Sequence, residues 1–237
     1  MAAAGSGERL GAGGPKAFVA LAGRPLVEWS IAAMRSSPAV GSIVVACPPG
    51  HVHELGGDDL GVVEGGATRA RSVANALDAV GTELVAIHDA ARPLVTPELV
   101  EGVVAALVAH PEADGAIAAA PATDTIKQVR PGPGGRPPGS SQDYPGHDPE
   151  KAAIGVESTI DRGRLWAAQT PQVFRVEALR RALEADPAQV EAATDEAMLV
   201  EAMGGRVLIH PAPAENLKVT TPLDLRVAEL LLAERDG

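Results

Sequence analysis

The fold of this chain is decided by its opening stretch, AAAGSGERLGAGGPK, which runs from Ala2 to Lys16. Its small residues let the backbone approach a bulky anion, and exposed backbone N–H groups can follow a chain of phosphates. Two cations in the stretch, Arg9 and Lys16, can neutralise those phosphates. The stretch predicts a cradle for a nucleoside triphosphate; a flexible Gly/Ala-rich terminus is the alternative.

Two better-known phosphate loops are excluded by single positions. A Walker loop needs Ser or Thr after its lysine, and here Ala17 follows Lys16. A dinucleotide-binding fingerprint needs a third glycine in register with Gly5 and Gly7, where this chain has Leu10.

Composition excludes several classes of protein. The chain has 237 residues, enough for one large domain, and 46% of them are hydrophobic. No apolar run reaches the length of a membrane span, and no basic-then-apolar secretory signal is visible. The single cysteine, Cys47, suits a reducing cytoplasm, and the net charge of −11 disfavours nucleic acid and anionic membranes as partners.

Short β-rich runs alternate with helical stretches, which is typical of a mainly parallel sheet flanked by helices. We expect one α/β domain over residues 1–237, with strands at 42–47, 61–64, 84–88, 115–119 and 206–210. Helices are expected from Pro25 to about Arg35, after the capping residues Thr68 and Thr96, and over 194–204 and 221–235.

A second cluster with chemical character, His88-Asp89-Ala90-Ala91-Arg92-Pro93, follows directly after the predicted strand 84–88. Ligands of open α/β sheets bind beyond the carboxyl ends of the strands. A carboxylate at Asp89 can hold Mg²⁺ there, and Arg92 can neutralise an anion. A structural role is the alternative: Asp89 can cap a turn, and Arg92 can pair with it.

Two features depart from this regular pattern. Residues 131–149, PGPGGRPPGSSQDYPGHDP, are rich in turn formers and predict a loop inside an arm. A phosphate loop normally follows a buried strand, yet only Met1 precedes the alanines. We therefore expect either a very short strand at this place or a β-branched run just upstream of Ala2.

Taken together, these segments resemble one family. AAAGSGERLGAGGPK, GGATRARSV, HDAARP, DTIK, TIDR, QTPQVF, TDEA and NLKVT occur in the order found in 2-C-methyl-D-erythritol 4-phosphate cytidylyltransferases. The resemblance implies a Rossmann-like nucleotidyltransferase with a protruding β-arm. It implies transfer of a cytidylyl group from CTP to methylerythritol 4-phosphate, with Mg²⁺, in isoprenoid precursor synthesis.

The resemblance also implies roles for individual residues. The implied catalytic residues are Arg9, Lys16 and Lys218. Asp89 would serve Mg²⁺ and the α-phosphate. The positions that match the cytidine pocket are Ala3, Ala4, Gly5, Gly66 and Ser72. The positions implied for the acceptor are Arg92, Thr159, Asp195 and Arg175. The family forms homodimers through an arm that corresponds to about 124–162 here, with the insertion at 131–149.

This sequence departs from the family at two of these places. Ala67 stands where an acidic or polar residue is usual. Some members place an acceptor-binding Arg at the position of Val176, whereas here Arg175 comes one residue earlier. Two other functions stay open: a cytidylyltransferase acting on ribitol 5-phosphate, another linear polyol phosphate, and a non-catalytic nucleotide-binding protein.

Overall fold

The computed structural model describes residues 1–5, 14–57, 59–130 and 155–235, which form two compact units. The first unit joins Met1–Ala120 to Ala168–Gly237, and the second is Pro121–Ala167. Arg9 and the predicted insertion at 131–149 lie outside the described residues. Among the described residues, no helix is both long and apolar enough to cross a membrane.

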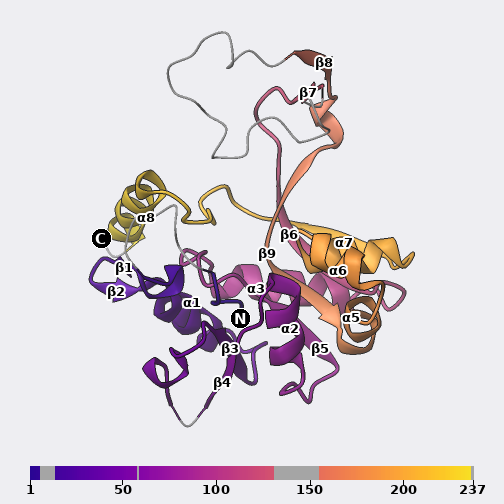
Figure 1. Cartoon of the computed structure of the whole chain (residues 1–237). Coiled ribbons are helices and arrows are strands. Elements are labelled where there is room, and N and C mark those ends of the chain that lie inside the picture. The colour runs from indigo at the N-terminus through magenta and orange to yellow at the C-terminus, as the bar shows by residue number, and fades with distance from the viewer. Residues whose placement is uncertain (6–13, 58, 131–154, 236–237) are drawn as a thin grey trace. The chain divides into compact units, whose positions relative to one another are not determined.

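A four-stranded sheet in the order β10-β6-β9-β5 lies at the centre of the first unit (Figure 1). Its strands are β5 Leu84–Ile87, β6 Gly115–Pro121, β9 Trp166–Arg175 and β10 Val207–Pro211. β10 runs parallel to β6, whereas β5 pairs antiparallel with β9. A second pair, β3 Ile43–Cys47 and β4 Leu60–Glu64, is parallel. The α/β class is thus confirmed, with a mixed sheet, and β9 is a strand that the sequence did not predict.

Helices cover both faces of this sheet. The helices that the structure describes are α1 Leu26–Arg35, α2 Arg69–Leu77, α3 Pro97–Val108, α5 Val176–Leu183, α6 Pro187–Ala192, α7 Glu196–Ala202 and α8 Pro222–Arg235. Ala116 and Ala118 of β6 pack in one apolar cluster with α1 and α3, while Ile117 between them packs with α2, α5 and α7. This alternation requires a strand that is apolar on both faces, which explains the uninterrupted apolar run of β6.

The helix starts follow from capping residues. Thr68 Oγ1 accepts a hydrogen bond from Arg71 N at 3.1 Å, and Thr96 Oγ1 accepts one from Leu99 N at 3.3 Å, as predicted. α7 is capped by Asp195, one residue after the predicted start. α5 was not predicted because its N-cap, Arg175, makes no side-chain capping bond and therefore carries no capping signal.

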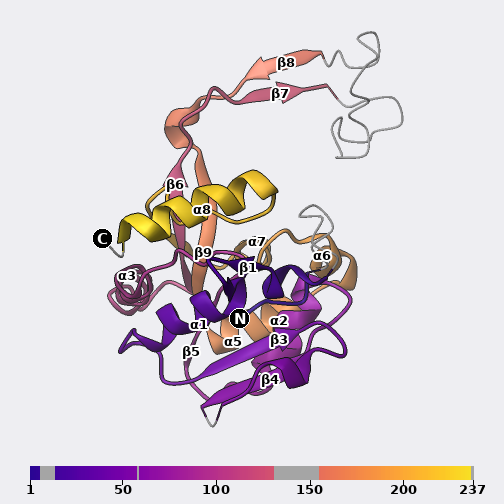
Figure 2. The same cartoon turned by 90° about the vertical axis from the view of Figure 1, so that its left-hand side faces the viewer.

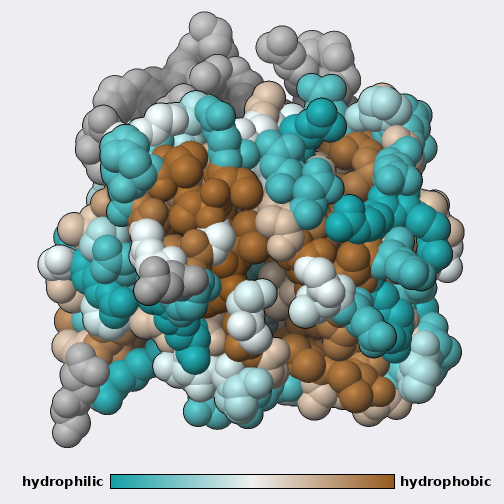
Figure 3. All heavy atoms as spheres, turned by 90° about the horizontal axis from the view of Figure 1, so that it is seen from below, coloured by the Kyte–Doolittle hydropathy of each residue, from teal (hydrophilic) through white to brown (hydrophobic). Residues whose placement is uncertain are grey.

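The first residues of the chain join the two groups of strands. Ala2 makes parallel bridges to both Ala46 and Asp89, and Ala46 N donates to Met1 O at 3.0 Å. Behind this junction lies a cavity of about 520 Å³, whose lining includes Val44 on β3 and Ala86 on β5. The face seen from below carries several apolar patches between polar ones (Figure 3).

A small apolar cluster holds α8 against the start of α1. Residues Ala20–Leu21 and Arg24–Pro25 form the short antiparallel strands β1 and β2, both labelled in Figure 1, while Figure 2 shows α8 along its length. Leu21 and Leu26 pack there with Val219, Ala228 and Leu232. The segment just before α8 is therefore anchored at its apolar residue Val219.

The second unit is built on an antiparallel ribbon. β7 Lys127–Val129 pairs with β8 Val156–Thr159, with Lys127 opposite Thr159. Ala122 N donates to Leu165 O at 2.9 Å, which closes the base of the ribbon. The arm predicted at 124–162 lies within this unit.

Candidate active site

The site begins where β5 ends, at a turn held by a buried histidine. Asp89 N donates to Thr170 Oγ1 at 3.1 Å, and this hydroxyl lies 3.0 Å from His88 Nδ1. His88 Nε2 lies 3.2 Å from Arg92 O. A carbonyl oxygen only accepts, so Nε2 carries the proton and Nδ1 accepts from the Thr170 hydroxyl. Burial lowers the pKa of His88 to about 3, which keeps the ring neutral.

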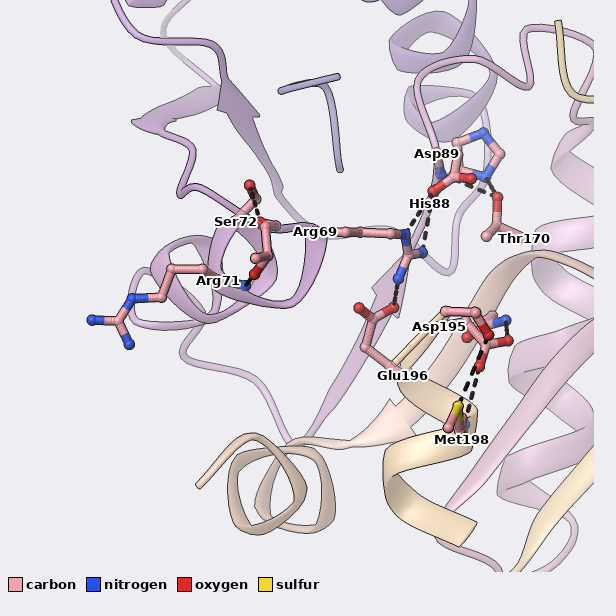
Figure 4. A network of polar contacts seen from close by, with 12 residues as sticks. Arg69, Arg71, Ser72, His88, Asp89, Thr170, Asp195, Glu196 and Met198 are labelled. Atoms are coloured by element: carbon pink, nitrogen blue, oxygen red, sulfur yellow. Dashed lines mark hydrogen bonds and ion pairs between the residues drawn. The ribbon is translucent and has the colours of Figure 1, made fainter. Parts of the chain in front are cut away.

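Asp89 lies between two cations. Nε and Nη2 of Arg69 donate to its Oδ1 at 3.3 and 3.1 Å, and Lys218 Nζ lies 2.6 Å from its Oδ2 (Figure 4 shows the Arg69 side). Burial alone would raise the pKa of Asp89, but Arg69 and Lys218 hold it well below its usual range. The carboxylate is therefore ionised throughout the neutral pH range.

Lys218 reaches Asp89 because hydrogen bonds hold the Lys218 segment against the turn that follows β5. Asn216 Nδ2 donates to Gln169 Oε1 at 2.8 Å and to Thr170 O at 2.9 Å. Arg92 Nη1 donates to Asn216 O at 2.7 Å, and Val219 N donates to Ala91 O at 2.8 Å. Asn216 is buried, whereas the Lys218 side chain is 41% exposed. The backbone is thus fixed, while the side chain that carries the ammonium group to Asp89 stays partly exposed.

The residues predicted for the cytidine pocket form a second, adjoining group. Ala3 N donates to Ala46 O at 3.0 Å, and Ser72 Oγ accepts from Gly66 N at 3.0 Å. A Cβ on Gly65 would lie 2.5 Å from the Ala4 Cβ and 3.0 Å from the Cys47 carbonyl, closer than real atoms allow. The glycine before the helix is therefore required by close backbone approach to the opening segment.

The two ends of the glycine-rich loop meet at the same place. Lys16 N donates to Gly5 O at 3.2 Å, which brings the start of the 3₁₀ turn Lys16–Phe18 to the start of the loop. Lys16 is half-buried. Arg9, the other predicted cation, belongs to the loop residues that the structure does not describe.

The remaining predicted residues lie in different surroundings. Asp195 caps α7 and its Oδ2 accepts from Gln172 Nε2 at 2.8 Å, while the next residue, Glu196, contacts Arg69. Arg175 Nε donates to Ala113 O at 2.9 Å, and its strand partner is Leu84, at the opposite end of β5 from Asp89. Thr159 accepts a 2.6 Å hydrogen bond from Lys127 Nζ within the second unit.

Four residues of the site were missed from the sequence. Arg69 and Glu196 form an ion pair, and Thr170 and Asn216 fix the turn and the Lys218 segment. Thr170 and Asn216 were visible only as members of quoted motifs, without a role. The sequence did contain a signal for Arg69. A cation in the first turn of a helix is disfavoured by the helix dipole, which predicts a carboxylate close to it.

The chain is similar to known proteins over most of its length. A model of the family described as 2-C-methyl-D-erythritol 4-phosphate cytidylyltransferase matches residues 1–133 and 148–234. The break between the two matched ranges falls inside the predicted insertion. The protein of that name from Symbiobacterium thermophilum is 40% identical over 242 residues, covering 98% of this chain and 91% of the relative. The one from Frankia casuarinae is 43% identical over 240 residues, covering 99% and 80%.

Solved structures agree with the fold. The crystal structure of 2-C-methyl-D-erythritol 4-phosphate cytidylyltransferase from Thermus thermophilus superposes with a TM-score of 0.72 at 33% identity, covering 92% of this chain and 94% of that one. The structure from Francisella tularensis has a TM-score of 0.75 at 28% identity and covers 96% and 95%.

Proposed function

The chain belongs to the 2-C-methyl-D-erythritol 4-phosphate cytidylyltransferase family, and we propose that the group around Asp89 is where it performs that reaction. The enzyme transfers the cytidylyl group of CTP to methylerythritol 4-phosphate and releases pyrophosphate, a step in non-mevalonate isoprenoid precursor synthesis. The observation that carries the proposed site is the ionised Asp89 held between Arg69 and Lys218 at the carboxyl end of β5.

Cytidylyl transfer requires stabilisation of negative charge on the phosphates and does not require a covalent intermediate with the protein. The acceptor phosphate attacks the α-phosphorus of CTP directly while negative charge builds on the α-phosphoryl oxygens and the leaving pyrophosphate. A preorganised cation stabilises that charge without reorganising during the step. Lys218 has a partly exposed side chain on a fixed backbone, which suits it to orient the attacking phosphate. We assign Arg9 and Lys16 to the triphosphate from their place in the opening loop.

The donor set at Asp89 fits a divalent metal bound largely through substrate. No group of three or more His, Cys, Asp or Glu side chains is assembled among the residues that the structure describes. Mg²⁺ commonly uses one or two carboxylates and takes its other ligands from phosphates and water. Asp89 would hold it, and the metal would supply further neutralisation of phosphate charge.

The nucleotide and the acceptor are assigned to different parts of the site. We assign Ala3, Ala4, Gly5, Gly66 and Ser72 to the cytidine, because small residues permit close approach of the base and ribose. We assign Arg92 to the acceptor, because its Nη1 donates to the carbonyl of Asn216, two residues before Lys218. Asp195, also assigned to the acceptor from the family resemblance, caps α7. The position of Arg175 gives no support to an acceptor role.

Thr159 and the arm belong to a proposed homodimer. Thr159 lies in the second unit, opposite Lys127. We propose, as the family resemblance implies, that this unit contacts a second copy and brings Thr159 to an acceptor site. We also place the enzyme in the cytoplasm, where its single cysteine stays reduced.

Pyrophosphate release tests the function and its acceptor. With CTP and Mg²⁺, the protein is expected to release pyrophosphate with methylerythritol 4-phosphate and far more slowly with ribitol 5-phosphate. Release with neither acceptor would support a non-catalytic nucleotide-binding protein. Faster release with ribitol 5-phosphate would assign the chain the other acceptor.

Two substitutions test the proposed residues. Lys218→Gln should lower kcat by about 100-fold, the scale of removing one preorganised donor, while Arg226→Gln, an exposed cation on α8, should not. Asp89→Asn should lower kcat and raise the Mg²⁺ concentration needed for half-maximal rate. If Asp89→Asn changes only the melting temperature, its carboxylate is structural and the metal role is wrong.

A further inference from the structure

Arg69 joins two carboxylates that belong to distant parts of the chain. Its Nη1 donates to Glu196 Oε2, while Nε and Nη2 donate to Asp89 Oδ1 at 3.3 and 3.1 Å. Figure 4 shows the guanidinium between the two acids, with Arg71 of the same helix pointing away. Arg69 begins α2 and Glu196 begins α7, so the ion pair ties the starts of two helices to the turn after β5.

Helix stability does not explain Arg69, and the dipole of α7, which favours an acid in its first turn, does not require that Glu196 be buried. A cation in the first turn of α2 opposes the helix dipole. Glu196 is only 1% exposed, and burial raises its pKa even though Arg69 favours the charged form. Buried ion pairs are often no more stabilising than apolar residues of similar size, so such a pair is weak evidence for a stabilising role. A role in geometry is the better explanation.

The geometry that Arg69 controls is the rotation of the Asp89 carboxylate. The terminal torsion of Asp is broad and has no strong intrinsic preference. Two donors of Arg69 hold Oδ1, and Lys218 Nζ takes Oδ2 at 2.6 Å. The two oxygens are thereby given different partners. Oδ1 faces a guanidinium that is itself anchored by a buried acid, and Oδ2 faces the more exposed lysine.

We propose that Arg69 is a positioning residue for cytidylyl transfer: anchored by Glu196, it fixes the orientation of the Asp89 carboxylate and directs Oδ2 toward Lys218 and the metal–triphosphate. This inference rests on the proposed role of Asp89. Glu196 acts only through Arg69, because its described hydrogen bond is to that guanidinium and not to Asp89 or Lys218.

The competing explanation is that the ion pair of Arg69 and Glu196 is a structural staple, that is, a contact that only holds α2 and α7 together. A staple affects stability and leaves the properties of the folded enzyme unchanged. A positioning pair affects the metal and the chemical step, because misplacing a reacting group by about 1 Å costs on the order of 100-fold in rate. Measurements of kcat and of metal affinity at a temperature where every variant is folded therefore distinguish the two explanations.

The experiment compares Arg69→Gln, Glu196→Gln and the double variant with the native enzyme. Steady-state kinetics give kcat and the KM for CTP, and electron paramagnetic resonance gives the affinity for Mn²⁺ with CTP present and acceptor omitted. We expect Arg69→Gln to lower kcat at least tenfold and to weaken Mn²⁺ binding, with little change in the KM for CTP. Glu196→Gln keeps the side-chain volume and should show a smaller loss of the same kind.

The double variant tests whether the two residues act in series. Since Glu196 acts through Arg69, the double variant should lose no more than Arg69→Gln alone, whereas independent effects would multiply. Arg71→Gln is the matched control, because it removes an exposed cation from the same helix. It should leave kcat and Mn²⁺ affinity unchanged.

The outcomes distinguish this inference from the function on which it rests. If the native enzyme and Arg71→Gln release no pyrophosphate, the proposed function fails. If they are active and Arg69→Gln keeps both its kcat and its Mn²⁺ affinity while losing melting temperature, Arg69 is a staple and the inference is overturned. Multiplying losses in the double variant would overturn the role of Glu196.

Discussion

At the scale of single residues, the site depends on one neutral histidine and one ionised aspartate side by side. His88 has no charge to offer Asp89; it contributes two hydrogen bonds that hold the turn, one with Thr170 and one with the Arg92 carbonyl. Asp89 is ionised because Arg69 and Lys218 together outweigh its burial. Burial thus disfavours the charged form of both residues, and Asp89 stays charged because two cations lie beside it.

The neutral state of His88 makes stability depend on pH in a defined direction. The pKa of His88 is lowered from 6.5 to about 3, so between these values the unfolded chain binds a proton that the folded chain does not. Unfolding is therefore favoured as pH falls, by about 1.4 kcal/mol per pH unit for this group. His88→Gln keeps a donor toward the Arg92 carbonyl and does not titrate.

Urea denaturation of the native protein and His88→Gln at several pH values between about 4.5 and 7.5 measures this effect. The native protein should lose stability relative to the variant as pH falls below 6.5, the ordinary pKa of the group, and the other histidines cancel because both chains carry them. A difference in stability that stays constant with pH would show that His88 binds protons equally in the folded and unfolded states, so that folding does not lower its pKa.

At the scale of elements, α2 and α3 begin in the same way but serve different purposes. Each has a threonine N-cap that accepts from a backbone N–H three residues on, Thr68 in α2 and Thr96 in α3. α2 starts with Arg69 at the site, whereas α3 contributes buried residues such as Val100 and Val103 to the core. The two caps therefore make a matched pair for separating stability from positioning.

Thr68→Ala and Thr96→Ala should each lower the free energy of unfolding by about 1 kcal/mol, the usual contribution of a threonine N-cap. Thr68→Ala should in addition lower kcat/KM for CTP, because the freed first turn of α2 loosens Arg69 and Ser72. Thermal denaturation and steady-state kinetics on both variants measure this. Equal kcat/KM in the two variants would contradict this prediction, because it would show that the first turn of α2 keeps its geometry without the Thr68 cap.

At the scale of the whole first unit, the sheet is interrupted between β3 and β5. Ala2 bridges to Ala46 in β3 and to Asp89 just after β5, but a cavity of about 520 Å³ lies between the facing edges of the two strands. Ala46 N donates to Met1 O and Ala2 N donates to His88 O, and alternate residues of a strand direct their amides to the same side. The amides of Val44 and Ala86 consequently face the cavity, whereas β6 has a neighbouring strand on each side.

Hydrogen exchange followed by NMR should therefore show weaker protection at these two edges. The amides of Val44 and Ala86 are expected to exchange at least about tenfold faster than those of Ala116 and Ala118 in β6, a difference of about 1.4 kcal/mol in opening free energy. Val45 is the internal control within β3, because its amide faces the paired strand β4. Equal protection at Val44 and Ala116 would mean that the cavity edges are covered.

Local patterns in the sequence determined much of this protein. The apolar runs of β3, β4, β5, β6 and β10, the caps Thr68 and Thr96, and the position of Asp89 after β5 were all predicted, because each depends on a few neighbouring residues. The resemblance to the family was readable for the same reason, since its motifs are short and ordered. α5 escaped prediction because its N-cap makes no side-chain capping bond, and β9 because a proline, Pro171, lies inside it.

Only the tertiary structure decided which charges meet. Arg69 and Glu196 are separated by 127 residues, and Lys218 reaches Asp89 from beyond β10. Nothing local marks these pairs, because long-range ion pairs depend on how the strands and helices are ordered in space. The same holds for His88, whose neutrality follows from complete burial, and for Arg175, whose place at the far end of β5 follows from the antiparallel register of β9. Sequence supplied the reactive residue types, and packing determined their partners, their exposure and so their charge.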